Sequence, residues 1–307
     1  MMAHVRAHNS TEGEGGFVIV AVLWLIAALA ALAVIFSAYL ANSARALALN
    51  DTALQAEALV SAGVELTTYQ LRLSDDDKRP ARGSFQTRLN GADLAVSFVS
   101  EAARIDLNAA PKELLAGLFA VLGASAEDSA QFADRIIGWR TKATTENAGA
   151  EEALYRAAGR TYGPRQALFA HVNELGLVLG LPPALVERAM PFITVFSGGA
   201  GVDVLNAPPE VVAALPGVTP LVLNQFLNDR GSLSNDPQAI ATALGGAKSD
   251  AITQKSQAYR LRIRVRSPNG REAASEVVIA LRGEEDPYQV LSWQNDVVAP
   301  RRAPAKV

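Results

Sequence analysis

One uncharged apolar run near the N-terminus limits the possible folds of this chain more than any other feature. Residues 17–44 (FVIVAVLWLIAALAALAVIFSAYLANSA) contain no Asp, Glu, Lys or Arg. About 20 apolar residues are enough for a helix to cross a bilayer. The run is therefore predicted to span a membrane.

The segment ahead of this run is short and polar and ends in Gly15-Gly16. A secretory signal has an apolar core of about 7–15 residues, followed by a small-residue cleavage site. Here the core is longer, and the small residues precede it. A cut after Gly16 would leave the whole apolar run on the mature protein, and the alternative is a plain N-terminal anchor.

Composition argues against several classes of function. The 307 residues include no Cys, which excludes disulfides, thiol catalysis and thiolate metal sites. His171 is the only His outside the leader, so neither a His-rich zinc site nor a Ser-His-Asp triad is supported. A net charge of −3 gives no sign of a general nucleic-acid surface. The chain is predicted to be a structural or binding protein, with His171 as a surface or structural residue.

The segment after the apolar run predicts a helix and then a hairpin. Residues 45–73 are rich in strong helix formers with one apolar face, so the anchor is expected to continue as one long helix. The stretch 74–80 ends it, and its three Asp are either a solvated loop or calcium ligands. Alternating apolar residues on both sides of Asn90-Gly91 predict a β-hairpin within 83–101.

From residue 105 the pattern is helical for about 140 residues. Asn108 is expected to cap a helix that has Pro111 in its first turn and runs to Gly123. Further elements are predicted as helices at 126–140, 151–156, 172–179 and 183–190, and as a short strand at 192–196.

A short repeat lies inside this helical part. PKELLAGL at 111–118 returns as PPEVVAAL at 208–215, 97 residues later, with Asn-Ala just before each copy. The repeat predicts two related helical units. Leu215-Pro216-Gly217 in the second copy is typical of a helix-hairpin-helix turn.

Strands return at the C-terminus. Apolar residues from Tyr259 to Val265 alternate with Arg260, Arg262, Arg264 and Arg266, which predicts a strand with one basic face. This face is interpreted as solvated, the alternative being a partner surface. Strands are also expected at 274–282, after an Asn-Gly turn, and at 288–293.

The predicted fold class is α+β. A long N-terminal helix packs on an antiparallel sheet, and a large all-α insert contains two related helical units of SAM-like or helix-hairpin-helix-like type. The expected divisions are a leader at 1–16, a transmembrane helix at 17–44, helix and hairpin at 45–104, a helical insert at 105–200, a second helical unit at 201–255, strands at 256–294 and a disordered tail at 295–307.

The N-terminal junction resembles the type IV prepilin signal. The resemblance implies cleavage between Gly16 and Phe17 by prepilin peptidase, followed by N-methylation of Phe17. That family usually has Glu at the fifth mature position, where this chain has Ala21. K-class minor pseudopilins lack that Glu, as suits a subunit at a filament tip.

The order of motifs along most of the chain is similar to the K-class minor pseudopilins of type II secretion (GspK). The resemblance implies a pilin-like frame and a tip subunit that initiates or caps a pseudopilus and supports export of folded proteins across the outer membrane. It also implies I- and J-class minor pseudopilins and an inner-membrane assembly platform as partners, and a single-pass inner-membrane protein with its bulk in the periplasm. The motifs that carry the resemblance are IDLNAAPKELL, GAEEALY, HVNELGLVLGL, FITVF and VLNAPPEVVAAL.

Three alternatives remain beside this interpretation. Family members can hold calcium near the acidic pair that matches Glu151 and Glu152, so calcium is possible but not required; a solvated helix start is the alternative. A membrane-anchored DNA receptor of the competence type also combines an anchor with helix-hairpin-helix units. Its expected positive charge is missing, because 201–250 has five acids and two bases and 105–200 has ten acids and eight bases. An enzyme is disfavoured, since adjacent acids on a helix do not face one another.

Overall fold

The computed structural model describes residues 14–76, 78–144, 149–233, 236–246, 253, 255–283 and 285–295, without side chains for 14–17 and 44–53. The chain divides into two units, Met1–Ala58 and Leu59–Val307, which are described separately. Most of the predicted leader and, apart from Asn295, the predicted disordered tail lie outside the described residues.

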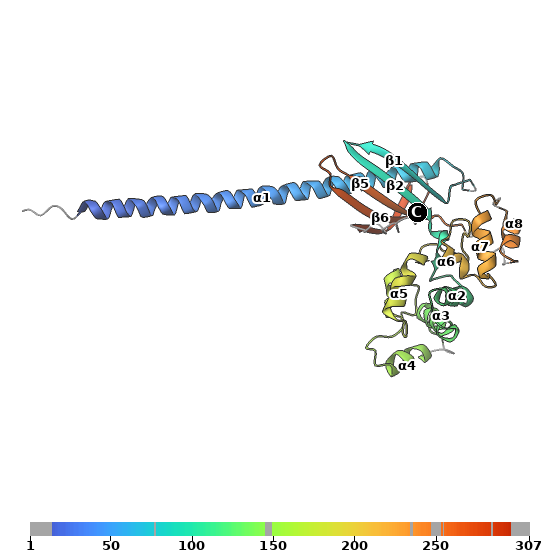
Figure 1. The fold of residues 1–307 in the computed structure, drawn as a ribbon. Coiled ribbons are helices and arrows are strands. Elements are labelled where there is room, and N and C mark those ends of the chain that lie inside the picture. Colours follow the sequence, from blue (N-terminus) through green and yellow to red (C-terminus); the bar gives the residue numbers. More distant parts are fainter. Residues whose placement is uncertain are drawn as a thin grey trace, which may run out of the picture. The chain divides into compact units, whose positions relative to one another are not determined.

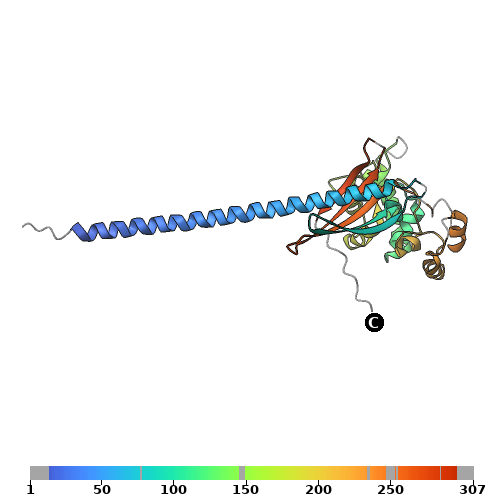
Figure 2. The same cartoon turned by 90° about the horizontal axis from the view of Figure 1, so that it is seen from above.

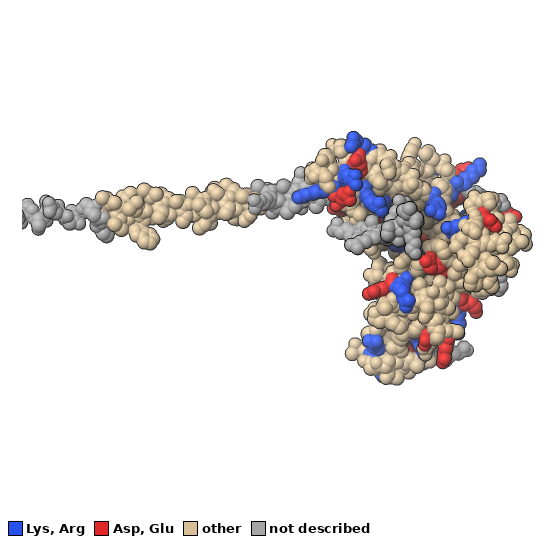
Figure 3. All heavy atoms as spheres, viewed as in Figure 1, with Lys and Arg blue, Asp and Glu red and all other residues tan. Residues whose placement is uncertain are grey.

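A single helix, α1 (Glu14–Arg72), includes the apolar run and its predicted continuation. Within it, Val18–Ser43 is long and apolar enough to span a membrane, with a mean hydropathy of 3.1 and no residue buried in the structure. Figure 3 shows this segment without charged side chains. The predicted long helix is confirmed, and it ends two residues before Ser74, as the turn sequence indicates.

The second unit is built on a five-stranded antiparallel sheet with strand order β1-β2-β5-β6-β7 (Figure 1). The predicted first hairpin is confirmed, with Asn90 and Gly91 both at positive φ in its turn. Strands β2 and β5 are neighbours in the sheet although about 160 residues separate them, so everything between them is an insertion. The strands are β1 (Arg82–Leu89), β2 (Ala92–Ser100), β5 (Ala258–Arg266), β6 (Glu272–Leu281) and β7 (Tyr288–Asn295).

The last turns of α1 pack on one face of this sheet, within the second unit (Figure 2). Val60, Val64 and Leu71 of the helix share a buried apolar cluster with alternate strand residues such as Leu94. Close approach is possible because Gly63 faces Ile263, where an added Cβ would lie 3.2 Å from the Ile side chain. The period-2 pattern of the strands is therefore explained by a buried face under the helix.

The insertion forms its own apolar core, separate from the cluster under α1. Phe119, Tyr155 and Phe226 are its largest fully buried side chains. Its 3-10 helices are η1 (Glu101–Ala103), η2 (Val172–Leu177) and η3 (Met190–Phe192), its strands are β3 (Ile105–Asp106) and β4 (Ile193–Thr194), and its α-helices are α2 (Lys112–Val121), α3 (Ala126–Arg140), α4 (Ala150–Ala157), α5 (Pro183–Ala189), α6 (Pro209–Ala213), α7 (Pro220–Asp229) and α8 (Pro237–Ala243).

Two local predictions in the insertion are wrong. It is not all-helical, because β3 and β4 form a short parallel sheet. Asn108 is not the cap of α2, whose N-cap is Pro111 without a side-chain hydrogen bond. The Asn108 amide instead donates to the carbonyl oxygen of Phe169 and accepts from its N–H. The local sequence predicts that the Asn108 side chain caps a helix, but in the structure it binds a residue 61 positions away.

The two copies of the repeat begin with equivalent turns. The Asp106 carbonyl oxygen accepts from the N–H groups of residues three and four positions later, and the Asp203 carbonyl oxygen does the same. Burial raises the pKa of both Asp side chains. In each copy an Arg at the end of the second helix closes the turn, since Arg140 donates to the Ala110 carbonyl and Arg230 donates to the Ala207 carbonyl. Residues 110 and 207 are 97 positions apart, as are the two Asp.

The first helices of the two copies, α2 and α6, pack against each other. A Cβ added at Gly117 would lie only 2.0 Å from the carbonyl oxygen of Ala214. These two residues are also 97 positions apart, so the contact joins equivalent points of the repeat. Only glycine at position 117 permits this approach.

Candidate functional site

The predicted processing site lies at the start of α1. Gly16 and Phe17 have helical backbone there, and Ala21 is exposed four residues further along. Every residue from 18 to 42 is exposed, including large apolar side chains such as Trp24 at 73%. A surface of this kind is stable only in lipid or against other apolar helices.

Glu151 and Glu152, the predicted calcium ligands, lie on α4 and bind separate arginines. A carboxylate oxygen of Glu151 lies 3.0 Å from Nη1 of Arg135, and one of Glu152 lies 2.8 Å from Nη2 of Arg156. Calcium takes six to eight oxygen ligands. Among the described residues no group of three or more His, Asp or Glu side chains forms a metal site. Within the described residues, each of these two carboxylates is therefore engaged by an arginine.

His171 has a structural role, as predicted. Its Nδ1 accepts a hydrogen bond of 3.1 Å from the N–H of Asn173 and so caps η2. The imidazole ring is therefore hydrogen-bonded to the backbone of its own segment, which agrees with the expectation of a surface or structural residue.

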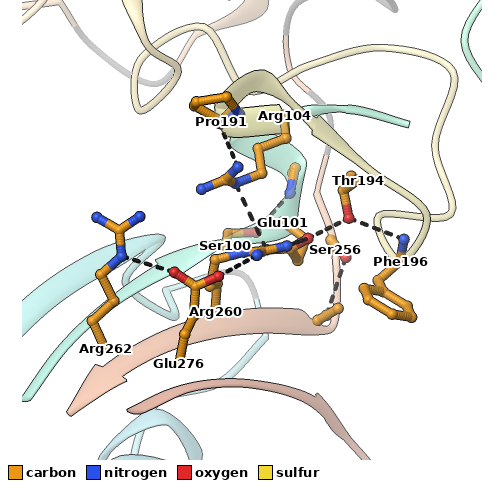
Figure 4. Close-up of polar contacts among 12 residues, drawn as sticks. Ser100, Glu101, Arg104, Pro191, Thr194, Phe196, Ser256, Arg260, Arg262 and Glu276 are labelled. Atoms are coloured by element: carbon orange, nitrogen blue, oxygen red, sulfur yellow. Dashed lines mark hydrogen bonds and ion pairs between the residues drawn. The ribbon is translucent and has the colours of Figure 1, made fainter. Parts of the chain in front are cut away.

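A buried carboxylate that sequence reasoning missed lies where the sheet meets the insertion. Glu101 follows β2 directly, and its side chain is fully buried. Arg260 of β5 donates to both its oxygens, with distances of 2.7 Å from Nε to Oε1 and 3.0 Å from Nη2 to Oε2. The hydroxyl of Thr194, from β4, donates to Oε2 (Figure 4). One side chain thus joins the sheet to the insertion.

A second carboxylate extends this network along the sheet. Glu276 of β6 accepts from Nη1 of Arg260 and, at 2.9 Å, from Nε of Arg262 (Figure 4). Burial alone would raise the pKa of Glu276, but the charge of Arg260 and hydrogen bonds from both arginines hold it below its ordinary value. Burial also opposes the charge of Arg260, and its bonds to Glu101 more than reverse that effect, so the pKa of Arg260 is raised.

A third guanidinium in the network, that of Arg104, makes only a long ion pair with Glu101. Arg104 is 9% exposed, donates to the Pro191 carbonyl, and has its Nε 3.9 Å from Oε1 of Glu101. Burial, together with repulsion from Arg260, lowers the pKa of Arg104 to about 10. The network therefore contains three guanidinium groups and two carboxylates. Its charges and hydrogen bonds join the sheet to the insertion.

The basic face of β5 is only partly as predicted. Arg262, Arg264 and Arg266 are exposed, but the side chain of Arg260 is only 12% exposed and is fully paired. The prediction of a solvated face is wrong for Arg260, because the insertion covers that end of the strand. Part of the pairing had a signal in the sequence, since the hairpin register places Arg262 opposite Glu276. Nothing in the local sequence marked Glu101.

Comparison with known proteins gives a family match and a structural match. Residues 87–198 match the family model described as Type II secretion system (T2SS), protein K. No curated protein matches the chain. The structure is similar to a chain in the crystal structure of the GspK-GspI-GspJ complex from the enterotoxigenic Escherichia coli type 2 secretion system. The two share 16% identity with a TM-score of 0.59, over 83% of this chain and 99% of that one. At 16% identity, this similarity shows that the two chains share a fold.

Proposed function

We propose that this chain is a minor pseudopilin at the tip of the pseudopilus. It belongs to the type II secretion system protein K family, on its match over residues 87–198. In this role it initiates or caps assembly and supports export of folded proteins across the outer membrane. The family is a structural component of the secretion system and not an enzyme. The family match is the single observation that carries the proposal, and the apolar N-terminal helix supports it.

The apolar segment supplies a mechanism for assembly. After cleavage between Gly16 and Phe17, Val18–Ser43 can leave lipid only by packing against similar helices of other subunits, and its many small Ala residues allow close approach. Ala21 leaves the segment without the buried charge that repeating subunits use. We therefore place it as a single-pass inner-membrane protein with its bulk in the periplasm.

The insertion favours an end position in a filament. It places helices α2 to α8 between two adjacent strands of the sheet and so greatly enlarges the folded unit. A repeating subunit has to leave room for identical neighbours, whereas a terminal subunit does not. We propose I- and J-class minor pseudopilins as direct partners, supported by the similarity to a chain of a GspK-GspI-GspJ complex. We also propose prepilin peptidase, which processes the chain, and the inner-membrane assembly platform as partners.

The finer fold assignment belongs to the same proposal. α1 on an antiparallel sheet is a pilin-like frame, and the equivalent turns at Asp106 and Asp203 support two related helical units of SAM-like or helix-hairpin-helix-like type. In the competence-type DNA receptor, such units bind phosphate with the help of nearby Lys or Arg side chains. Here both units have a net negative charge, so they are assigned to protein contacts.

A secretion assay tests the function. Deletion of the gene is expected to stop release of type II substrates from the cell, and the full-length chain is expected to restore it. Labelled protein is expected at one end of isolated pseudopili. Label along the filament would contradict the tip position. Unchanged secretion in the deletion strain, together with tight and salt-sensitive DNA binding by the purified chain, would contradict the proposed function and favour the DNA receptor.

A further inference from the structure

A groove of about 520 Å³ runs between the outer face of the sheet and the loop ahead of α6. Both walls belong to the second unit. Its lining contains no Asp or Glu among the described residues, and its five arginines come from four different places in the sequence. They are Arg82, Arg104, Arg230, Arg260 and Arg262.

The positive charge of this groove is not balanced from within. Its three network arginines, Arg104, Arg260 and Arg262, share only two carboxylates, because Arg104 lies 3.9 Å from the Glu101 carboxylate that Arg260 binds at 2.7 Å and Arg262 binds Glu276. A buried charge is costly unless it is paired. Burial, and after it the positive charge of Arg260, lowers the pKa of Arg104 to about 10.

Two further arginines add charge at the edges of the groove. Arg82, on the edge strand β1, is exposed and has no acidic partner among the described residues. Arg230 donates from Nη1 to the Ala207 carbonyl at 2.8 Å, and this bond neutralises no charge. The other arginine of the β1–β2 hairpin, Arg88, does have a carboxylate, that of Asp93 at 2.9 Å. Arg82 and Arg230 thus add to the groove two guanidinium groups that no described carboxylate pairs.

We propose that this groove binds an acidic segment of a partner protein, with several carboxylates facing Arg82, Arg104, Arg230 and Arg262. A carboxylate from outside would supply the negative charge that the buried network lacks. Arginine also suits this ligand, since its planar fork binds carboxylates through two parallel hydrogen bonds.

The spacing of the charges favours a polypeptide over a small anion. Arg82 and Arg260 lie in the same row of the sheet with β2 between them, so their backbones are about 10 Å apart. Arg262 lies about 7 Å further along β5. A single phosphate cannot reach all of these groups, whereas an extended acidic segment can.

Fluorescence anisotropy of labelled octaglutamate with the full-length chain in detergent tests the proposal. Saturable binding is expected, weakening as salt rises because the contacts are ionic. Arg82→Ser is expected to weaken binding by about threefold or more, since one charge-assisted contact is lost. Arg88→Ser is the matched control, with the same strand, face and net charge but a position outside the groove; it is expected to leave binding unchanged.

Each other outcome would overturn the proposal. Absence of saturable binding at low salt would do so, as would equal weakening by Arg82→Ser and Arg88→Ser. Displacement of octaglutamate by an equal or lower concentration of inorganic phosphate would assign the groove to small anions, and tighter binding of a DNA oligonucleotide would assign it to nucleic acid. Circular dichroism of both variants shows that they are folded. Secretion assays are independent of this test, so it can fail while the proposed function stands.

Discussion

Glu101 shows how one buried side chain can hold two parts of a folded unit together. It accepts hydrogen bonds from β5 and β4, and its own position is fixed by the hydroxyl of Ser100, which accepts from the Ala102 N–H. Charge-assisted bonds of this kind are about twice as strong as neutral ones. Removing one partner of a buried ion pair leaves the other charge unpaired, and that is the costly step.

Glu101→Gln is expected to lower the free energy of unfolding by about 3–5 kcal/mol, because Arg260 loses its main partner and Arg104 loses its nearest carboxylate. Chemical denaturation followed by tryptophan fluorescence measures the change. Asp93→Asn, which breaks the exposed pair with Arg88, is the control and should cost less than about 1 kcal/mol. Similar losses of unfolding free energy in the two variants would show that the buried Glu101 pair stabilises the fold no more than the exposed pair of Asp93 and Arg88 does.

Glu276 gives the fold a dependence on acid. Its pKa in the folded state lies below the ordinary value of 4.5, so the folded state binds fewer protons than the unfolded state in that range. The stability that Glu276 contributes is therefore present above pH 4.5 and is lost as pH falls through its folded pKa.

The measurement is unfolding free energy against pH for the wild type and for Glu276→Gln. The variant is expected to be less stable near pH 7 and to show a shallower decline on acidification, so that the two curves approach each other below pH 4.5. Parallel curves with a constant gap would mean that Glu276 contributes through packing and not through its charge.

At the scale of elements, the contact between α2 and α6 depends on a missing side chain. Alanine is normally better than glycine in a helix by about 1 kcal/mol. At position 117 that preference is outweighed, because an added Cβ would meet the Ala214 carbonyl at 2.0 Å, and backbone cannot move aside as a flexible side chain can.

Gly117→Ala is expected to destabilise the chain by about 1–3 kcal/mol, the usual cost of overpacking a core. Gly176→Ala is the matched control, since nothing lies within 4 Å of an added Cβ there. Denaturation midpoints of the two variants decide the matter. A Gly117→Ala protein as stable as the wild type would show that α2 and α6 can separate without cost.

At the scale of the whole molecule, the N-terminus decides how the chain meets the membrane. Cleavage between Gly16 and Phe17 would remove the polar leader and keep the apolar segment on the protein. A plain anchor would keep its polar leader.

Mass spectrometry of the membrane-extracted protein is expected to find a chain that starts at N-methylated Phe17. Gly16→Val should retain the leader, because the peptidase would lose the residue after which it cuts. Gly13→Val, three residues earlier, should be processed normally. An intact N-terminus in the unaltered protein would rule out the prepilin pathway and leave a plain anchor.

The sequence by itself determined the elements that depend on local physics. The apolar run, the Asn90-Gly91 hairpin and the helix at Ala126–Arg140 need only hydropathy, turn chemistry and a side-chain cap, and all three agree with the structure. The alternation along β5 likewise identified a strand with one buried face.

Only the tertiary structure decided which polar residues became partners. Asn108 faces Phe169, and Glu101 faces Arg260, across 61 and 159 residues. Such pairs leave no local pattern, because burial in the assembled core, and not spacing along the chain, makes them stable. For the same reason the arginines of the groove, drawn from β1, β5 and the insertion, come together only in the fold.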